Sequence, residues 1–113
     1  MPRKNLVLGL DWDDTVSAFP EACAILANQF AKCVIITLND DLSLETAKSV
    51  LNRADLELEC CPYSRTDFTV WKIERCRAHQ VAVMLDDDPE IIKACESAGI
   101  PAIYLGIPAW RSD

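Results

Sequence analysis

Short apolar runs and helix-like segments alternate along the whole of this sequence. The five apolar runs show no helical period, which is typical of buried strands; they are Leu6–Leu10, Val34–Thr37, Leu56–Cys60, Val81–Leu85 and Ala102–Tyr104. Such alternation predicts parallel strands joined by helical crossovers, with helices on both faces of one sheet. We therefore expect an α/β fold, with a five-stranded, mainly parallel sheet in a single three-layer, Rossmann-like domain.

The segments between these runs carry helix-start signals. Ser43 and Asp67 are the predicted N-caps of the second and third helices, and Asp88-Pro89-Glu90 begins a fourth that ends at Gly99. The first helix has Pro20 in its first turn. Periodicity predicts two inward-facing stripes, made of Ala22, Ile25, Leu26 and Phe30 in the first helix and of Val70, Ile73 and Cys76 in the third.

The composition fits one compact domain that spans residues 1–113. Half of the residues are hydrophobic and only three are glycine, whereas disordered chains are poor in apolar residues. The apolar run near the N-terminus is too short for a signal peptide or a membrane span, so we expect a cytoplasmic protein with no membrane association. Nothing in the sequence predicts the oligomeric state.

Charge and cysteine content narrow the class of partner. The net charge of −7, with no Lys/Arg cluster beyond the first residues, argues against a nucleic-acid partner, because a broad acidic field repels phosphate backbones. The six cysteines show no C-x-x-C spacing and His79 is the single histidine, whereas zinc sites need four convergent ligands. We therefore expect free thiols packed as small hydrophobes.

An acidic stretch follows the first predicted strand directly. Asp11 and Asp13 stand two residues apart after Leu10. If both lie in the turn beyond the strand, they can face one cavity and share a hard cation, which prefers oxygen ligands. Carboxylates so crowded repel one another unless a metal or a base offsets their charge. An acidic loop is the plain alternative for this segment alone, but the rest of the sequence favours a phosphoryl-transfer site.

Further polar residues follow the other strands at the same edge of the predicted sheet. Thr37 ends the second strand, the pair Asp86-Asp87 ends the fourth, and Lys72 lies in the first turn of the helix after the third. In open sheets of this kind ligands bind beyond the carboxyl ends of the strands. Carboxylates, a hydroxyl, an ammonium group and a metal are the groups that phosphoryl transfer requires.

In this order, the polar residues resemble the four motifs of the haloacid dehalogenase-like (HAD) superfamily of aspartyl phosphatases. The matching segments are Asp11-Trp12-Asp13-Asp14-Thr15, Val34-Ile35-Ile36-Thr37, Lys72 and Val83-Met84-Leu85-Asp86-Asp87. The resemblance covers nearly the whole chain. It implies a Mg²⁺-dependent phosphatase that acts on a phosphorylated substrate.

The resemblance also implies a role for each matched residue. Asp11 would be the nucleophile that forms an aspartyl-phosphate, and Asp13 would protonate the leaving group and later deprotonate water. Thr37 and Lys72 would hold the transferring phosphoryl group. Mg²⁺ would be bound by the Asp11 carboxylate, the backbone carbonyl of Asp13 and one member of the pair Asp86-Asp87.

The spacing of the motifs leaves no room for the cap domain that many members of this superfamily carry. Only Val16–Phe19 separates the first motif from the first helix, so we expect an open site that suits a bulky or macromolecular phosphate ester. Two alternatives stay open: a phosphotransferase, in which an acceptor other than water takes the phosphoryl group, and a non-catalytic regulatory or binding module. A response-regulator receiver domain is disfavoured, because its phosphorylated Asp would follow the third strand, where Cys60-Cys61 stands.

Overall fold

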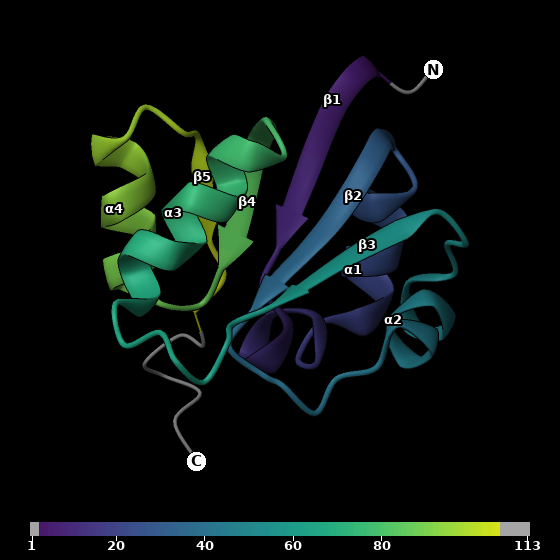
Figure 1. The fold of residues 1–113 in the computed structure, drawn as a ribbon. Coiled ribbons are helices and arrows are strands. Elements are labelled where there is room, and N and C mark those ends of the chain that lie inside the picture. Colours follow the sequence, from purple (N-terminus) through teal and green to yellow (C-terminus); the bar gives the residue numbers. More distant parts are fainter. Residues whose placement is uncertain (1–2, 107–113) are drawn as a thin grey trace.

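The computed structural model describes residues 3–106, so the predicted domain of residues 1–113 extends past it at both ends. Five strands form one sheet in the order β3-β2-β1-β4-β5 (Figure 1). They are β1 (Arg3–Leu10), β2 (Phe30–Thr37), β3 (Leu56–Cys60), β4 (Val81–Asp86) and β5 (Ala102–Tyr104). Every pairing in the sheet is parallel, which confirms the predicted α/β class. All carboxyl ends therefore lie at one edge of the sheet.

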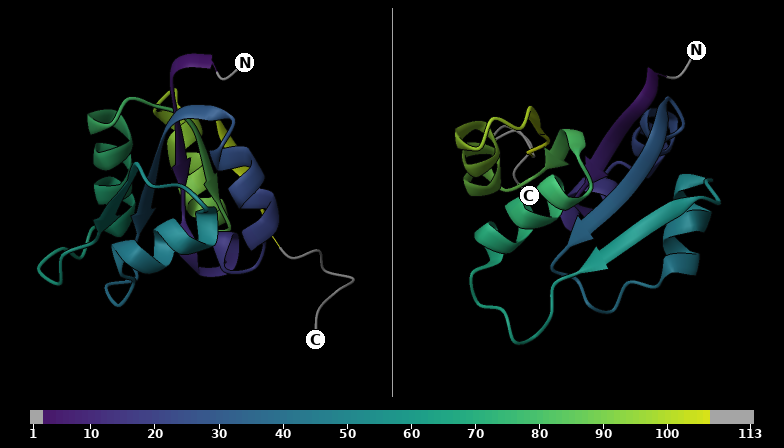
Figure 2. Two further views of the ribbon diagram at one scale, coloured as in Figure 1. Left: turned by 90° about the vertical axis from the view of Figure 1, so that its right-hand side faces the viewer. Right: turned by 45° about the horizontal axis from the view of Figure 1, so that its top comes forward.

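Four helices cover the two faces of this sheet: α1 (Pro20–Ala27), α2 (Leu44–Leu51), α3 (Phe68–Ala78) and α4 (Pro89–Ser97). The helices α1 and α2 pack on the face that carries Leu8 and Ile35, and α3 and α4 pack on the face that carries Val7 and Ile36. Figure 2 shows the sheet between α1 and α3. The side chains of neighbouring residues in a strand thus pack into opposite core layers, and this confirms the three-layer arrangement. No helix within residues 3–106 is long and apolar enough to cross a membrane.

The two central strands, β1 and β4, are closely packed at Gly9. Gly9 lies opposite Met84 in the ladder, and a Cβ at this position would stand 2.8 Å from Met84 Sδ and 3.0 Å from Val81 Cγ1. Only glycine therefore fits here without displacing core atoms. The ladder continues beyond β1, because the Asp11 N–H donates to the Leu85 carbonyl at 2.9 Å. The carboxyl ends of β1 and β4 are thereby held at the same level.

The predicted side-chain caps are confirmed at two helices. Ser43 Oγ accepts the Thr46 N–H at 3.1 Å, and Asp88 Oδ1 accepts the Glu90 N–H at 2.9 Å. Asp67 occupies the N-cap position of α3 as predicted, but its carboxylate accepts hydrogen bonds from Arg65 instead of capping the helix. All six cysteines are free thiols, and Cys60 is the one that is not fully buried.

The predicted inward stripe of α1 is wrong. Cys23 and Ala27 are the buried residues of α1, whereas Ile25 is 67% exposed and Phe30 belongs to β2. The inward face of α1 thus carries the small side chains Cys23 and Ala27, one helical turn apart. Apolar character alone therefore selects the wrong face of this short helix.

The predicted inward face of α3 is wrong by one residue. Val70 is 52% exposed, and the buried residues of α3 are Trp71, Lys72 and Cys76. A pattern built only on apolar residues misses this face because its centre is a buried lysine. Since α3 begins at Phe68, Lys72 lies in the second turn of the helix and not in the first.

Candidate active site

Polar side chains from both core layers meet at the carboxyl edge of the sheet, where they line a hollow of about 150 Å³. All six residues that the sequence assigned to catalysis or metal binding lie in its wall: Asp11, Asp13, Thr37, Lys72, Asp86 and Asp87. Residues that are up to 76 positions apart in the chain, such as Asp11 and Asp87, are therefore neighbours in the fold. The parallel sheet explains this, because each strand delivers its polar end residue to the same edge.

Lys72 is the central cation of this hollow. Its ammonium group lies 2.7 Å from Asp11 Oδ1 and 2.8 Å from Asp86 Oδ2, and the residue is 2% exposed. Burial by itself would lower the pKa of Lys72, but the two carboxylates outweigh it and raise that pKa. Lys72 is therefore charged at neutral pH and holds two carboxylates in fixed positions. Its third N–H remains to be donated into the hollow.

Three carboxylates, which we call the acid trio, surround one point near Lys72. One oxygen from each of Asp11, Asp86 and Asp87 lies within 4.8 Å of the other two. Lys72 offsets only one of these three charges. The acid trio therefore fits a hard divalent cation, which takes carboxylate oxygens as ligands and neutralises their repulsion.

Burial raises the pKa values of all three carboxyls of the acid trio. Burial raises the pKa of Asp11 to about 6, although Lys72 acts in the opposite direction, and Asp87 raises it further. At this site a proton and a divalent cation would compete for the same oxygens.

The carboxylate of Asp11 is held on both oxygens. Oδ1 accepts from Lys72, and Oδ2 accepts the Thr15 hydroxyl at 3.2 Å. Thr15 is fully buried, and the turn Trp12–Val16 brings its side chain back beside Asp11. Within this turn Asp14 adopts a left-handed conformation with φ 60°. The sequence analysis missed this role of Thr15, because the contact depends on a turn whose backbone is not helical at Asp13 and Asp14.

Asp13 lies at the open side of the hollow and is exposed. Its Oδ1 accepts a hydrogen bond from Asn39 Nδ2 at 3.1 Å, a contact that the sequence analysis also missed. The Asp13 carboxylate does not belong to the acid trio. Metal binding through its backbone carbonyl stays a prediction. An exposed, oriented carboxyl at this place can exchange protons with solvent and with a bound molecule.

Thr37 presents a hydroxyl group to the hollow from the end of β2. Thr37 is 1% exposed, and its Oγ1 accepts the Asn39 N–H at 3.0 Å. Its carbonyl accepts the Cys61 N–H at 2.9 Å, which ties the strand end to the segment after β3. With its oxygen accepting from the backbone, the hydroxyl can donate its hydrogen to an anion in the hollow.

The raised pKa of Asp11 gives a prediction for metal affinity. We expect the affinity of the protein for Mg²⁺ to fall about tenfold per pH unit as the pH drops below about 6, because Asp11 must lose its proton to bind the cation. Calorimetric titration with MgCl₂ in two buffers of different ionisation enthalpy measures both the affinity and the protons released. An affinity that does not change between about pH 7 and pH 5 would contradict this prediction.

The geometry provides an oriented buried carboxylate, a cation beside it, a hydroxyl donor, an exposed acid and a place for a divalent ion. Together these groups can bind a phosphoryl group and offer it a nucleophile. They occupy the strand ends at which α/β sheets bind ligands. Comparisons of the chain with family models, with curated proteins and with solved structures give no match in any of the three.

Proposed function

We propose that this protein is a Mg²⁺-dependent phosphohydrolase that works through an aspartyl-phosphate on Asp11. The observation that carries the proposal is the arrangement of Asp11, whose Oδ1 lies 2.7 Å from Lys72 Nζ and whose oxygens belong to the acid trio. A carboxylate that is oriented on both sides and opens on a hollow is suited to attack an electrophile. Its cationic neighbour is suited to hold the anionic group that is attacked.

In the first step, an oxygen of Asp11 forms a bond to phosphorus while the bond from phosphorus to the leaving-group oxygen breaks. The third N–H of Lys72 and the hydroxyl of Thr37 donate to the oxygens of the phosphoryl group, whose charge rises in the transition state. Asp13 gives its proton to the departing oxygen. The exposed position of Asp13 supports this role, since the leaving group must depart toward solvent.

In the second step, water attacks the phosphorus of the aspartyl-phosphate and the bond to the Asp11 oxygen breaks. Asp13 accepts the proton of the attacking water, so the two steps return both carboxyls to their starting state and release inorganic phosphate. Mg²⁺ held by the acid trio would supply positive charge near the phosphoryl oxygens. Asn39 is a positioning residue in this scheme, because it holds the Asp13 carboxylate by a hydrogen bond.

The order of these groups along the chain supports a wider proposal, that the protein is a capless member of the HAD superfamily. Each of the four motif segments contributes a residue to the lining of one hollow, and these residues are Asp13, Thr37, Lys72 and Asp87. A cytoplasmic location is part of the same proposal, and the six free thiols support it, because reducing compartments keep thiols unpaired. A phosphotransferase would use the same groups with a different acceptor, so analysis of the products separates these two activities.

The test is hydrolysis of 4-nitrophenyl phosphate by the purified protein with Mg²⁺ and with excess EDTA. We expect turnover that requires Mg²⁺, and an acyl phosphate on the protein that hydroxylamine cleaves during steady-state turnover. An Asp41→Asn variant is the matched control, since Asp41 is exposed and lies outside the hollow. Turnover that EDTA leaves unchanged, or no turnover of any phosphomonoester in a broad panel, would overturn the proposed function.

A further inference from the structure

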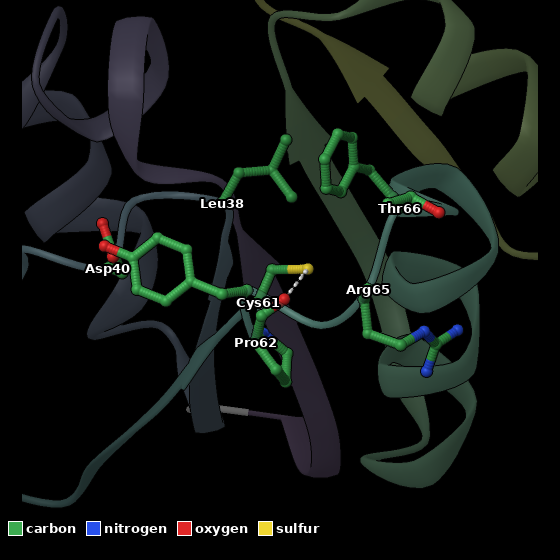
Figure 3. Close-up of a pocket in the computed structure, with 8 residues that line it drawn as sticks. Leu38, Asp40, Cys61, Pro62, Arg65 and Thr66 are labelled. Atoms are coloured by element: carbon green, nitrogen blue, oxygen red, sulfur yellow. Dashed lines mark hydrogen bonds between the residues drawn. The ribbon is translucent and has the colours of Figure 1, made fainter.

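A second hollow of about 290 Å³ opens beside the first. Leu38 and Cys61 extend into it, as Figure 3 shows, and Tyr63 and Phe68 contribute to its wall. Most of this wall comes from the loop that joins β3 to α3. The lining therefore combines aliphatic, sulfur and aromatic groups, which is the usual lining of a small-molecule subsite.

The two hollows adjoin at Leu38, which lines both of them. Leu38 directly follows Thr37, the hydroxyl donor of the first hollow. Cys61, which lines the second hollow, donates its N–H to the Thr37 carbonyl at 2.9 Å. A phosphate ester bound at Thr37 therefore has this second hollow beside it to receive the rest of the molecule.

The apolar side chains of this hollow are exposed to solvent rather than packed into the core. Tyr63 is 92% exposed, Phe68 is 47% exposed and Leu38 is 45% exposed. Exposed apolar groups gathered around one concave site indicate a binding surface, whereas scattered single ones do not. Flat aromatic faces favour a flat ring as the ligand, because stacked and edge-to-face pairs add to the burial of apolar area.

Among the described residues that line this hollow, the charged groups leave no free cation for a second anionic group. The guanidinium of Arg65 contacts Asp67 at 2.6 Å and Glu74 at 3.3 Å, and in Figure 3 it points away from the hollow. Asp40 lies beside the Tyr63 hydroxyl, and this neighbouring carboxylate raises the pKa of Tyr63. A ligand with negative charge at this place would meet Asp40 without a counter-charge, so the hollow selects against it.

The size of the hollow limits the ligand to about one ring system with a short connection. An apolar cavity of about 150 Å³ accommodates one benzene molecule in an engineered protein. The second hollow, at about 290 Å³, therefore has room for an aromatic ring together with the few atoms that would link it to a phosphate in the first hollow.

We propose that the second hollow binds the leaving group of the substrate and that this leaving group carries an aromatic ring without negative charge. The inference rests on the proposed function and deepens it by naming a substrate class. Tyr63 and Phe68 hold the ring, Leu38 and Cys61 cover its edges, and the phosphate lies at Thr37 and Lys72. The ring-bearing alcohol leaves through the open side after transfer of the phosphoryl group to Asp11.

The test compares 3-phenylpropyl phosphate with n-propyl phosphate, because the remote ring leaves the reactivity of the ester bond unchanged. We expect kcat/KM to be about tenfold or more higher for the ring-bearing ester, the value of an aromatic contact of about 1.4 kcal/mol. The variants Tyr63→Ala and Phe68→Ala should each remove most of this preference, so that the ratio of the two kcat/KM values falls toward one. Val70→Ala is the matched control, since Val70 is exposed on α3 and does not line the hollow.

A ring that bears a carboxylate should lose the preference, because the lining of the hollow offers it no free cation. Equal kcat/KM values for the two neutral esters, or a preference that survives both alanine variants, would overturn the subsite and leave the phosphohydrolase standing. If no ester is turned over, the proposed function fails, and binding of 3-phenylpropyl phosphonate still decides the subsite. Saturable shifts of the amide resonances of Leu38, Tyr63 and Phe68 would support it, and shifts confined to other residues would refute it.

Discussion

We expect Asp11→Asn to reduce the Mg²⁺-dependent hydrolysis of phosphate esters by a factor of about 10⁴ to 10⁶, the range typical of removing a nucleophile. The amide of asparagine keeps the shape of the side chain, but it cannot form the bond to phosphorus as a carboxylate oxygen does. Steady-state rates at saturating Mg²⁺ measure the loss, and mass spectrometry of the quenched protein shows whether the acyl phosphate still forms.

The same substitution is expected to stabilise the metal-free protein at neutral pH. The pKa of Asp11 is raised from 3.8 to about 6 in the folded state, so its ionised form disfavours folding above about pH 6. This cost disappears below the unfolded pKa, where both states are protonated. The variant removes the cost of burying this charge, but its neutral amide also loses the attraction of Lys72, which reduces the gain. We therefore expect a net gain on the order of 1 kcal/mol in the free energy of unfolding.

Two outcomes would contradict this prediction. Unchanged hydrolysis in Asp11→Asn would remove Asp11 from the mechanism, with Asp41→Asn as the control for the loss of one negative charge. A variant that loses both activity and stability would show that the ionised carboxylate is needed for the fold. Chemical denaturation of the metal-free proteins at pH 7 separates these cases.

We expect Lys72→Met to lower the free energy of unfolding at pH 7 by about 3–5 kcal/mol without metal, because it leaves Asp11 and Asp86 buried with no cation between them. Methionine fills a similar volume, so the loss reports charge and not packing. A loss of this size is a large share of the stability of a small domain. Urea denaturation with and without Mg²⁺ measures it.

Two conditions should restore much of the stability of Lys72→Met. Mg²⁺ would replace the missing positive charge at the acid trio, and acid would protonate the carboxylates, whose raised pKa values make the folded state relatively more stable as the pH falls. Lys93→Met is the matched control, because the Lys93 side chain is 74% exposed on α4. A loss that neither Mg²⁺ nor acid reduces would refute the charge argument.

The strands and the helix starts were predictable from local chemistry. Leu56–Cys60 and Ala102–Tyr104 have the predicted bounds, and Ser43 and Asp88 cap helices as expected. These features depend on residues within one element, such as a run of apolar side chains or an Asp followed by proline. The sequence analysis placed the starts of β1 and β2 several residues too far toward the C-terminus. The reason is that these strands include Arg3 and Lys32, which are not apolar.

The errors arise where tertiary contacts decide which face of a helix is buried. Lys72 faces the core because Asp11 and Asp86 lie there to receive its charge, and no periodicity of apolar residues can include a lysine. Ile25 and Val70 are exposed although they are strongly apolar. Apolar periodicity is a weak guide for a helix of eight residues such as α1, since few positions define its face.

The residues brought together in the first hollow were largely predictable, because a parallel sheet delivers all its strand ends to one edge. The supporting contacts were not. Thr15 reaches Asp11 only because the turn between them is kinked at Asp14, and Asn39 reaches Asp13 across two separate loops. The second hollow was missed for a similar reason, because it depends on the path of a loop without repeating structure.

The polar groups of the first hollow and the lining of the second come from different parts of the fold, and this has a consequence for substrate selectivity. The acids and the hydroxyl stand on a rigid frame of β1, β2 and β4, whereas Tyr63 and Arg65 come from the connection between β3 and α3. We therefore expect that exchanging residues 62–66 for another sequence of equal length changes which esters the protein accepts and leaves the proposed phosphoryl transfer to Asp11 unchanged. Such modularity would let one small scaffold diverge toward new substrates through changes in a single exposed connection.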